Sequence, residues 1–87
     1  MSPGARRPVL TKSAEKGIRA LPEHVLEACK TVLRGMAAGT ERGKKLKGEL
    51  SHLRSVRLGR THRLLYMEAA EEIQVVDVGP RGDVYKR

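Results

Sequence analysis

Four arginines recur at three-residue intervals in the middle of this chain: Arg54, Arg57, Arg60 and Arg63. The spacing would fit one face of a helix, but Gly48, Gly59 and the β-branched Val56 argue against a single long helix. If Arg57 lies late in one strand and Arg63 early in the next, a hairpin brings both guanidinium groups to one surface. Cations held this closely together indicate an anionic partner.

The charge of the whole chain points the same way. It carries 18 Lys and Arg against 10 Asp and Glu, a net charge of +8, and the stretch 42–63 is the most basic part. Such a balance is typical of proteins that bind RNA, DNA, an acidic protein or a membrane surface. Only Tyr66 and Tyr85 are aromatic, which excludes a platform of several rings for base stacking but leaves binding through phosphates open.

Length and composition predict one small domain, residues 1–87, with a modest core and a flexible segment 1–6. No apolar run approaches the roughly 18 residues of a membrane span, and no signal peptide is recognisable. We therefore expect a cytoplasmic protein without a membrane partner. The single cysteine, Cys29, excludes an internal disulfide and a cysteine-based metal site, and it lies on an apolar helix face. No other spacing suggests a metal site or a cofactor.

Periodicity and turn residues predict six elements. We expect a first strand at Arg7–Thr11, helices at Lys12–Leu21 and Pro22–Ala38, and strands at about Leu53–Leu58, Arg63–Glu68 and Glu72–Val78. The stretch 38–45 is expected to be a loop, and 79–82 to end the sheet before a short tail.

The order β-α-α-β-β-β predicts an α+β fold in which a helical hairpin packs on one face of a small antiparallel sheet. Two helices can cover only one face, so the other face should carry the arginines. Within the last strand, alternation places Ile73, Val75 and Asp77 on one face, and His62 should point away from the face of Arg63.

Several ordered motifs resemble the RelE/ParE superfamily, the toxins of bacterial and archaeal toxin–antitoxin pairs. The segments that resemble the central hairpin of the YoeB and RelE branch are Leu46-Lys47, Leu50-Ser51, Ser55, Arg57, His62-Arg63-Leu64 and Tyr66. Gly79-Pro80-Arg81-Gly82 and Tyr85-Lys86 are similar to the carboxyl end of archaeal RelE proteins, and Lys16 with Leu21-Pro22 to the family's helix break. The resemblance covers nearly the whole chain.

The resemblance implies a RelE-like fold and a metal-independent ribonuclease that cuts mRNA in the ribosomal A site and is blocked by an antitoxin. By position, the phosphate-contacting arginines would be Arg57, Arg63 and Arg81, and Tyr85 would hold the carboxyl-terminal catalytic position. The residues that would contact RNA are Lys44, Lys45, Lys47, Arg54, Arg60 and His52. Lys44 stands where the YoeB branch has its glutamate general base, so the general base stays open.

The residue types suit this chemistry. RNA cleaves itself when its 2′-hydroxyl is deprotonated, the phosphorane charge is stabilised and the 5′-oxygen is protonated; arginine suits the second task because its fork is always charged. Tyr85 could transfer the proton if neighbouring arginines favour its phenolate, and His52 or His62 could replace it. A plain role is open for each residue: Arg54 and Arg60 as solvated charges, and Arg81 and Tyr85 as cover for the sheet end.

Three functional readings are consistent with the sequence. The first is a ribosome-dependent endoribonuclease, inhibited by a small, partly acidic antitoxin and acting on mRNA and the ribosome. The second is a ParE-like toxin that inhibits DNA gyrase without cutting nucleic acid. The third is an inactive basic RNA-binding relative.

Overall fold

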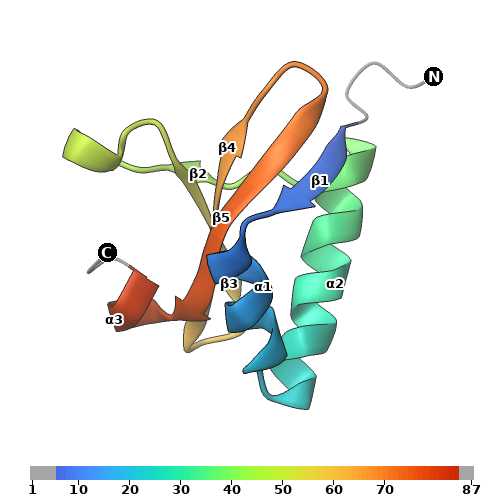
Figure 1. The fold of residues 1–87 in the computed structure, drawn as a ribbon, viewed down its shortest axis with the longest axis vertical. Helices are drawn as coiled ribbons and strands as arrows, with labels where there is room; N and C mark the ends of the chain where they lie inside the picture. The colour runs from blue at the N-terminus through green and yellow to red at the C-terminus, as the bar shows by residue number, and fades with distance from the viewer. Residues whose placement is uncertain (1–5, 85–87) are drawn as a thin grey trace.

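The computed structural model describes residues 6–84, and side chains for residues 6–82. The elements are β1 (Arg7–Leu10), α1 (Lys12–Arg19), α2 (Glu23–Ala38), β2 (Lys44–Lys45), the 3₁₀ turn η1 (Gly48–Leu50), β3 (Arg54–Leu58), β4 (His62–Glu68), β5 (Glu72–Pro80) and α3 (Arg81–Val84). The strands form one sheet in the order β1-β5-β4-β3-β2. Helices α1 and α2 lie on one side of this sheet, and η1 and α3 lie on the other (Figure 1). The expected α+β fold is confirmed.

Three details differ from the expectation. The sheet is mixed, because β1 pairs in parallel with β5 after the chain has crossed over through both helices. The segment Lys44–Lys45, expected in a loop, pairs with β3 over two residues, too few to give a periodic signal. A short helix, α3, starts at Arg81, where we expected only the end of the sheet. Arg6 is held by a hydrogen bond from its backbone N–H to the Ala37 carbonyl oxygen (3.0 Å), and the rest of the segment expected to be flexible lies outside the described residues.

Local sequence explains the helix boundaries. The Thr11 hydroxyl accepts a hydrogen bond from the backbone N–H of Ala14 (3.0 Å), which caps α1, and donates one to the Val76 carbonyl oxygen (2.7 Å) of β5. Helix α2 ends at Gly39, whose φ of 80° a side chain would disfavour. Gly17 packs directly on the backbone of Val78, so α1 approaches β5 too closely for any side chain at this position. None of the helices within residues 6–84 is long and apolar enough to cross a membrane.

The main core lies between the helices and the sheet. Its buried residues are Ala14, Val25, Cys29, Val32, Met36, Val56, Leu58, Leu64, Tyr66, Ile73, Val75 and Val78. The predicted burial of Cys29 is confirmed, and this burial raises the pKa of its thiol. The alternation expected along β5 is wrong beyond Val75, because a bulge pairs Tyr66 with Val75 but Leu65 with Asp77. The extra residue, Val76, turns Val78 into the core beside Val75.

Candidate nucleic-acid interface

Arg57 and Arg63 lie directly opposite each other in the antiparallel pair of β3 and β4. Their strand neighbours Val56, Leu58 and Leu64 are buried in the core under the helices, so alternation places both arginines on the face that α1 and α2 leave uncovered. Arg57 is exposed and Arg63 is half-buried. Directly opposed side chains on one face have Cβ atoms about 4.5–5.5 Å apart. The expected placement of these two arginines on one face of the hairpin is confirmed.

Ser55 helps to hold the more buried arginine. It lies two residues before Arg57 on the same face of β3, is 4% exposed, and accepts a hydrogen bond from Nη1 of Arg63 at 3.4 Å. This role of Ser55 could not be predicted from the sequence, because the contact joins residues of two strands. A buried hydroxyl beside the strand restricts the rotamers of Arg63 and so fixes part of the charge on this face.

The lysine-rich segment lies at the next strand of the same sheet. Lys44 pairs with Ser55 and Lys45 with Arg54, so Lys44 shares the face of Arg57 and Arg63, whereas Lys45 points to the other side. Lys47 precedes η1, and all three lysines are exposed. The residues that hold this segment to the uncovered face form a second apolar cluster: Leu46, Leu50, Leu53, Leu65, Met67 and Val76. This cluster places the basic segment beside the arginine pair.

The remaining arginines differ in their setting. The backbone N–H of Arg81 donates to the Thr61 carbonyl oxygen (2.8 Å), which joins the start of α3 to the β3–β4 turn, and Arg81 is exposed. Since α3 lies on the side of the sheet opposite α1, Arg81 begins an element that borders the uncovered face (Figure 1). Arg60 is exposed in the turn between β3 and β4. Tyr85 lies outside the described residues.

Arg54 is placed on the other face of the sheet. It pairs with the buried Tyr66, and its Nε donates to Oε1 of Glu68 at 3.0 Å. Its side chain is therefore engaged within the protein and directed away from Arg57 and Arg63. His52 is exposed and lines a hollow of about 220 Å³ with Lys45 and Arg54 at the edge of the sheet.

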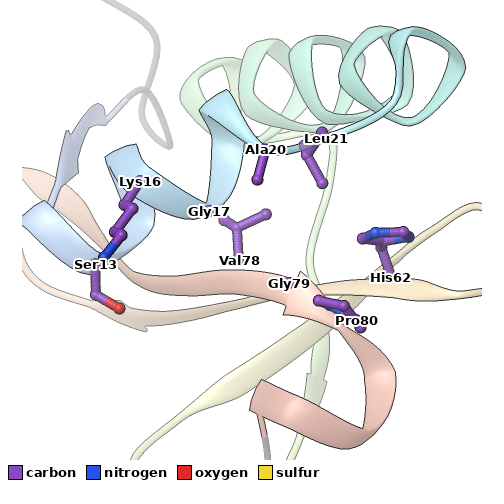
Figure 2. A pocket seen from close by; sticks show the side chains of 9 residues that line it. All are labelled: Ser13, Lys16, Gly17, Ala20, Leu21, His62, Val78, Gly79 and Pro80. Atoms are coloured by element: carbon purple, nitrogen blue, oxygen red, sulfur yellow. The ribbon is translucent and has the colours of Figure 1, made fainter.

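His62 lies on the helix side, as expected. Together with Lys16, Leu21 and Pro80 it lines a pocket of about 530 Å³ between α1 and the end of β5 (Figure 2). Its Nδ1 is 2.8 Å from the Thr61 hydroxyl. This position separates His62 from the arginine pair, so it is not suited to transfer a proton to a substrate bound there.

Glu68 is a polar centre that the sequence did not reveal. It lies at the end of β4 and contacts three arginines, Arg6, Arg42 and Arg54, at 3.0–3.2 Å. Desolvation alone would raise the pKa of the Glu68 carboxyl. The hydrogen bond and charge of Arg42, together with the charges of Arg54 and Arg6, lower it by more. The pKa therefore lies below its ordinary value of 4.5.

Comparison with known proteins gives matches among solved structures. No family model matches the sequence, and no curated protein gives a significant match. A chain of the RelBE2 toxin–antitoxin complex from Mycobacterium tuberculosis is 27% identical with a TM-score of 0.74, over 88% of this chain and 99% of that one. YafQ in the Escherichia coli DinJ–YafQ toxin–antitoxin complex gives a TM-score of 0.77 at 11% identity, over 92% and 97% of the two chains. The YoeB dimer of Staphylococcus aureus gives 0.72 at 17% identity, over 85% and 94%.

The described residues thus form a small α+β domain in which helices cover one face of the sheet and arginines lie on the other. The chain has the fold of the RelE/ParE superfamily, and its structural neighbours are toxins of the RelE, YoeB and YafQ type.

Proposed function

We propose that this protein is the toxin of a type II toxin–antitoxin pair and a metal-independent endoribonuclease that cleaves mRNA, in the ribosomal A site, in the cytoplasm. One observation carries the proposal: the direct opposition of Arg57 and Arg63 on the uncovered face of the sheet. Its structural neighbours are toxins, which supports the toxin role. The result of cleavage is the arrest of translation.

The proposed reaction uses the RNA's own nucleophile. The 2′-hydroxyl loses its proton, its oxygen bonds to the adjacent phosphorus, and the bond from phosphorus to the 5′-oxygen breaks as that oxygen takes up a proton. The products are a 2′,3′-cyclic phosphate and a free 5′-hydroxyl. Negative charge builds on the phosphorane oxygens. Two guanidinium groups held on rigid strands stabilise that charge without the free-energy cost of reorganising solvent around it. Arg81, at the start of α3, is the third phosphate contact in this proposal.

The proton-transfer groups are proposed from residue chemistry. Tyr85, which lies outside the described residues, is the first candidate base because of its position in the resemblance to RelE proteins. His52 is the second, because it is exposed beside the basic segment. A Tyr85→Phe variant and a His52→Gln variant separate the two: the variant of the true base loses cleavage while it retains RNA binding. Cleavage by both variants at the wild-type rate would exclude both residues.

The RNA backbone is held by the lysines in this proposal. Lys44 shares the face of the arginine pair, and Lys45 and Lys47 extend the positive surface along the edge of the sheet. Arg60 adds charge at the opposite end of the hairpin. Contacts of this kind neutralise phosphates without reading the base sequence, so the substrate's path is set by charge and by the ribosome.

The proposed partner is an antitoxin with an acidic toxin-binding segment. The chain has a net charge of +8, and residues 42–63 hold eight Lys or Arg against one acid, Glu49. This basic stretch favours a partner of opposite charge, which would cover the same face as RNA. An antitoxin and RNA should therefore compete for binding, and excess antitoxin should release a labelled RNA from the protein.

Expression in a bacterium tests the proposal. The wild-type chain should arrest translation and produce mRNA ends inside codons, Arg63→Ala should restore growth, and Arg34→Ala, on the exposed face of α2, should remain toxic. A DNA damage response with intact mRNA would instead indicate a gyrase inhibitor. Growth unaffected by the wild-type chain would indicate an inactive relative.

A further inference from the structure

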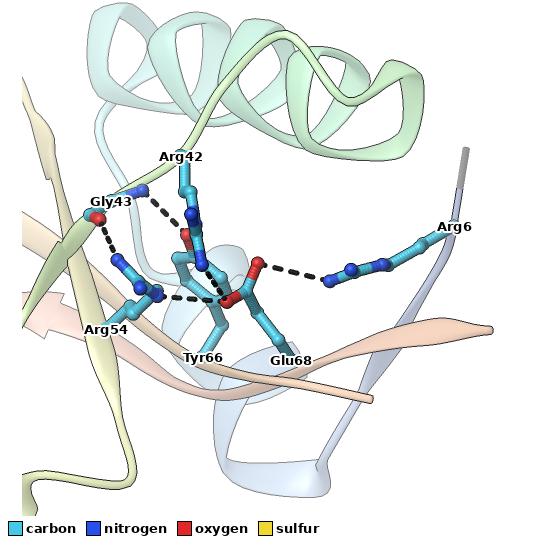
Figure 3. Close-up of polar contacts among 6 residues, drawn as sticks. All are labelled: Arg6, Arg42, Gly43, Arg54, Tyr66 and Glu68. Atoms are coloured by element: carbon cyan, nitrogen blue, oxygen red, sulfur yellow. Dashed lines mark hydrogen bonds and ion pairs between the residues drawn. The ribbon is translucent and has the colours of Figure 1, made fainter. Parts of the chain in front are cut away.

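Glu68 joins four segments of the chain at one carboxylate. Its Oε2 lies 3.1 Å from Nη1 of Arg6, which precedes β1, and its Oε1 lies 3.2 Å from Nη2 of Arg42, which precedes β2 (Figure 3). The same Oε1 accepts a hydrogen bond from Nε of Arg54 at 3.0 Å, at the start of β3. Three guanidinium groups on a partly buried carboxylate exceed what a single surface ion pair provides.

The side chains of Arg54 and Tyr66 bind the backbone of Gly43, the residue immediately before Lys44. The Gly43 N–H donates to the hydroxyl of Tyr66 (2.6 Å), and the Gly43 carbonyl oxygen accepts a hydrogen bond from Nη1 of Arg54 (2.8 Å) (Figure 3). Both polar backbone groups of Gly43 are therefore bound by side chains of β3 and β4. Tyr66 is 1% exposed, so its hydroxyl position is fixed by the core around the ring.

Packing at Gly43 is as close as its hydrogen bonds imply. A Cβ atom at this position would lie 2.6 Å from the Ser55 carbonyl oxygen and 2.7 Å from Cγ2 of Val56, both closer than van der Waals contact allows. Only glycine lets the chain pass this close to β3. Lys44 follows at once, opposite Ser55 and on the face of Arg57 and Arg63.

We propose that Glu68, Arg54 and Tyr66 are positioning residues, which act through Gly43 to hold Lys44, Lys45 and Lys47 where they contact RNA. We call Glu68, Arg54 and Tyr66 the Gly43 clamp. Arg54 serves RNA binding in this account although it lies on the far face of the sheet, because it fixes the backbone that presents Lys44. The inference rests on the proposed RNA-binding function of the lysines.

The direction in which Glu68→Gln changes the affinity for RNA distinguishes the clamp from general electrostatics. Glu68→Gln removes a negative charge from a basic protein, so electrostatics alone would tighten RNA binding. The clamp predicts weaker binding, because Arg42 and Arg54 lose their common partner. Glu72→Gln is the matched control: it removes the same charge at the same end of the sheet, where Glu72 lies 4.0 Å from Arg7.

The test compares purified full-length wild type, Glu68→Gln, Tyr66→Phe and Glu72→Gln. Affinity for a labelled single-stranded RNA oligonucleotide should fall about tenfold for Glu68→Gln and about threefold for Tyr66→Phe, which changes no charge. Amide hydrogen exchange at Gly43 and Lys45 should become faster in both variants. Glu72→Gln should bind RNA at least as tightly as wild type and retain the wild-type exchange rates.

Each other outcome overturns the inference. Unchanged exchange at Gly43 in Glu68→Gln would show that the clamp does not hold the segment. Faster exchange with unchanged or tighter RNA binding would show that the clamp does not position the lysines. A Lys44→Ala/Lys45→Ala/Lys47→Ala variant then shows which proposal is wrong. If it binds RNA more weakly than wild type, the lysines contact RNA and only the clamp is wrong. If it binds RNA as tightly as wild type, both the RNA contact of the lysines and the clamp are wrong.

Discussion

Arg57 and Arg63 face each other across β3 and β4, two positive charges at one register position of an antiparallel pair. Like charges placed directly opposite each other cost stability, of the order of 0.2–1 kcal/mol. Helices α1 and α2 cover the other face of the sheet (Figure 1), so register and alternation leave both side chains on the uncovered face. A phosphate between the two groups would turn this repulsion into attraction, which is the physical basis of the proposed site.

The repulsion itself can be measured. We expect Arg57→Gln to leave the free energy of unfolding unchanged or to raise it by up to about 0.5 kcal/mol, because it removes one of two opposed charges. Urea titration followed by circular dichroism gives this value. Arg34→Gln, on the exposed face of α2, should leave it unchanged. Destabilisation of Arg57→Gln by more than about 1 kcal/mol would mean that Arg57 supports the fold.

The lysines should determine how RNA binding depends on salt. A Lys44→Ala/Lys45→Ala/Lys47→Ala variant should reduce the slope of log affinity against log salt concentration by about 2, because each phosphate contact on a single strand contributes about 0.7. Fluorescence anisotropy over a salt series measures the slope. The control replaces three exposed helix lysines, Lys12, Lys16 and Lys30, and should change the slope less. Equal slopes for the two variants would contradict a localised contact.

Glu68 should make stability depend on acid. Its pKa is lowered in the folded protein, so its contribution to stability is fully present above the ordinary value of 4.5 and is lost as pH falls through the folded pKa. The free energy of unfolding of wild type should therefore exceed that of Glu68→Gln by about 1 kcal/mol at neutral pH. This difference should shrink as pH falls below 4.5 through the folded pKa. Urea titrations at a series of pH values test this. A difference that stays constant down to pH 3 would contradict the ionic contribution.

The contact of α1 with β5 should tolerate no side chain. Gly17→Ala places a methyl group against the Val78 carbonyl, and we expect it to lower the free energy of unfolding by about 1–3 kcal/mol. Gly82→Ala is the control, because among the described residues no atom outside its own stretch of α3 lies within 4 Å of the added Cβ. Thermal unfolding measures both variants. Equal melting temperatures for Gly17→Ala and wild type would mean that α1 packs less closely than described.

Sequence periodicity predicted the parts of the fold that are long and regular. Helix α2 and the three central strands follow from apolar spacing and from the glycines that end them. The parallel partner of β1 could not be predicted, because strand direction depends on the crossover and leaves no local signal. The bulge at Val76 was equally hidden, since an extra residue in a strand is visible only against its partner.

The candidate site could be predicted from the sequence only in part. That Arg57 and Arg63 share one surface was predicted from a hairpin between them, but their direct opposition depends on the register of β3 and β4. The role of Arg54 could not be predicted, because its partner Glu68 is 14 residues away and becomes a neighbour only through the register of β3 and β4. Contacts between strands decide which charges are available to a ligand and which are engaged within the protein.

Cleavage of mRNA on programmed ribosomes by purified protein is the decisive experiment for the proposed nuclease site. We predict that wild type and Arg34→Ala cut within the A-site codon at the same rate, and that Arg63→Ala, shown to be folded by circular dichroism, cuts about 100-fold more slowly. Cleavage by Arg63→Ala at the wild-type rate would contradict the account.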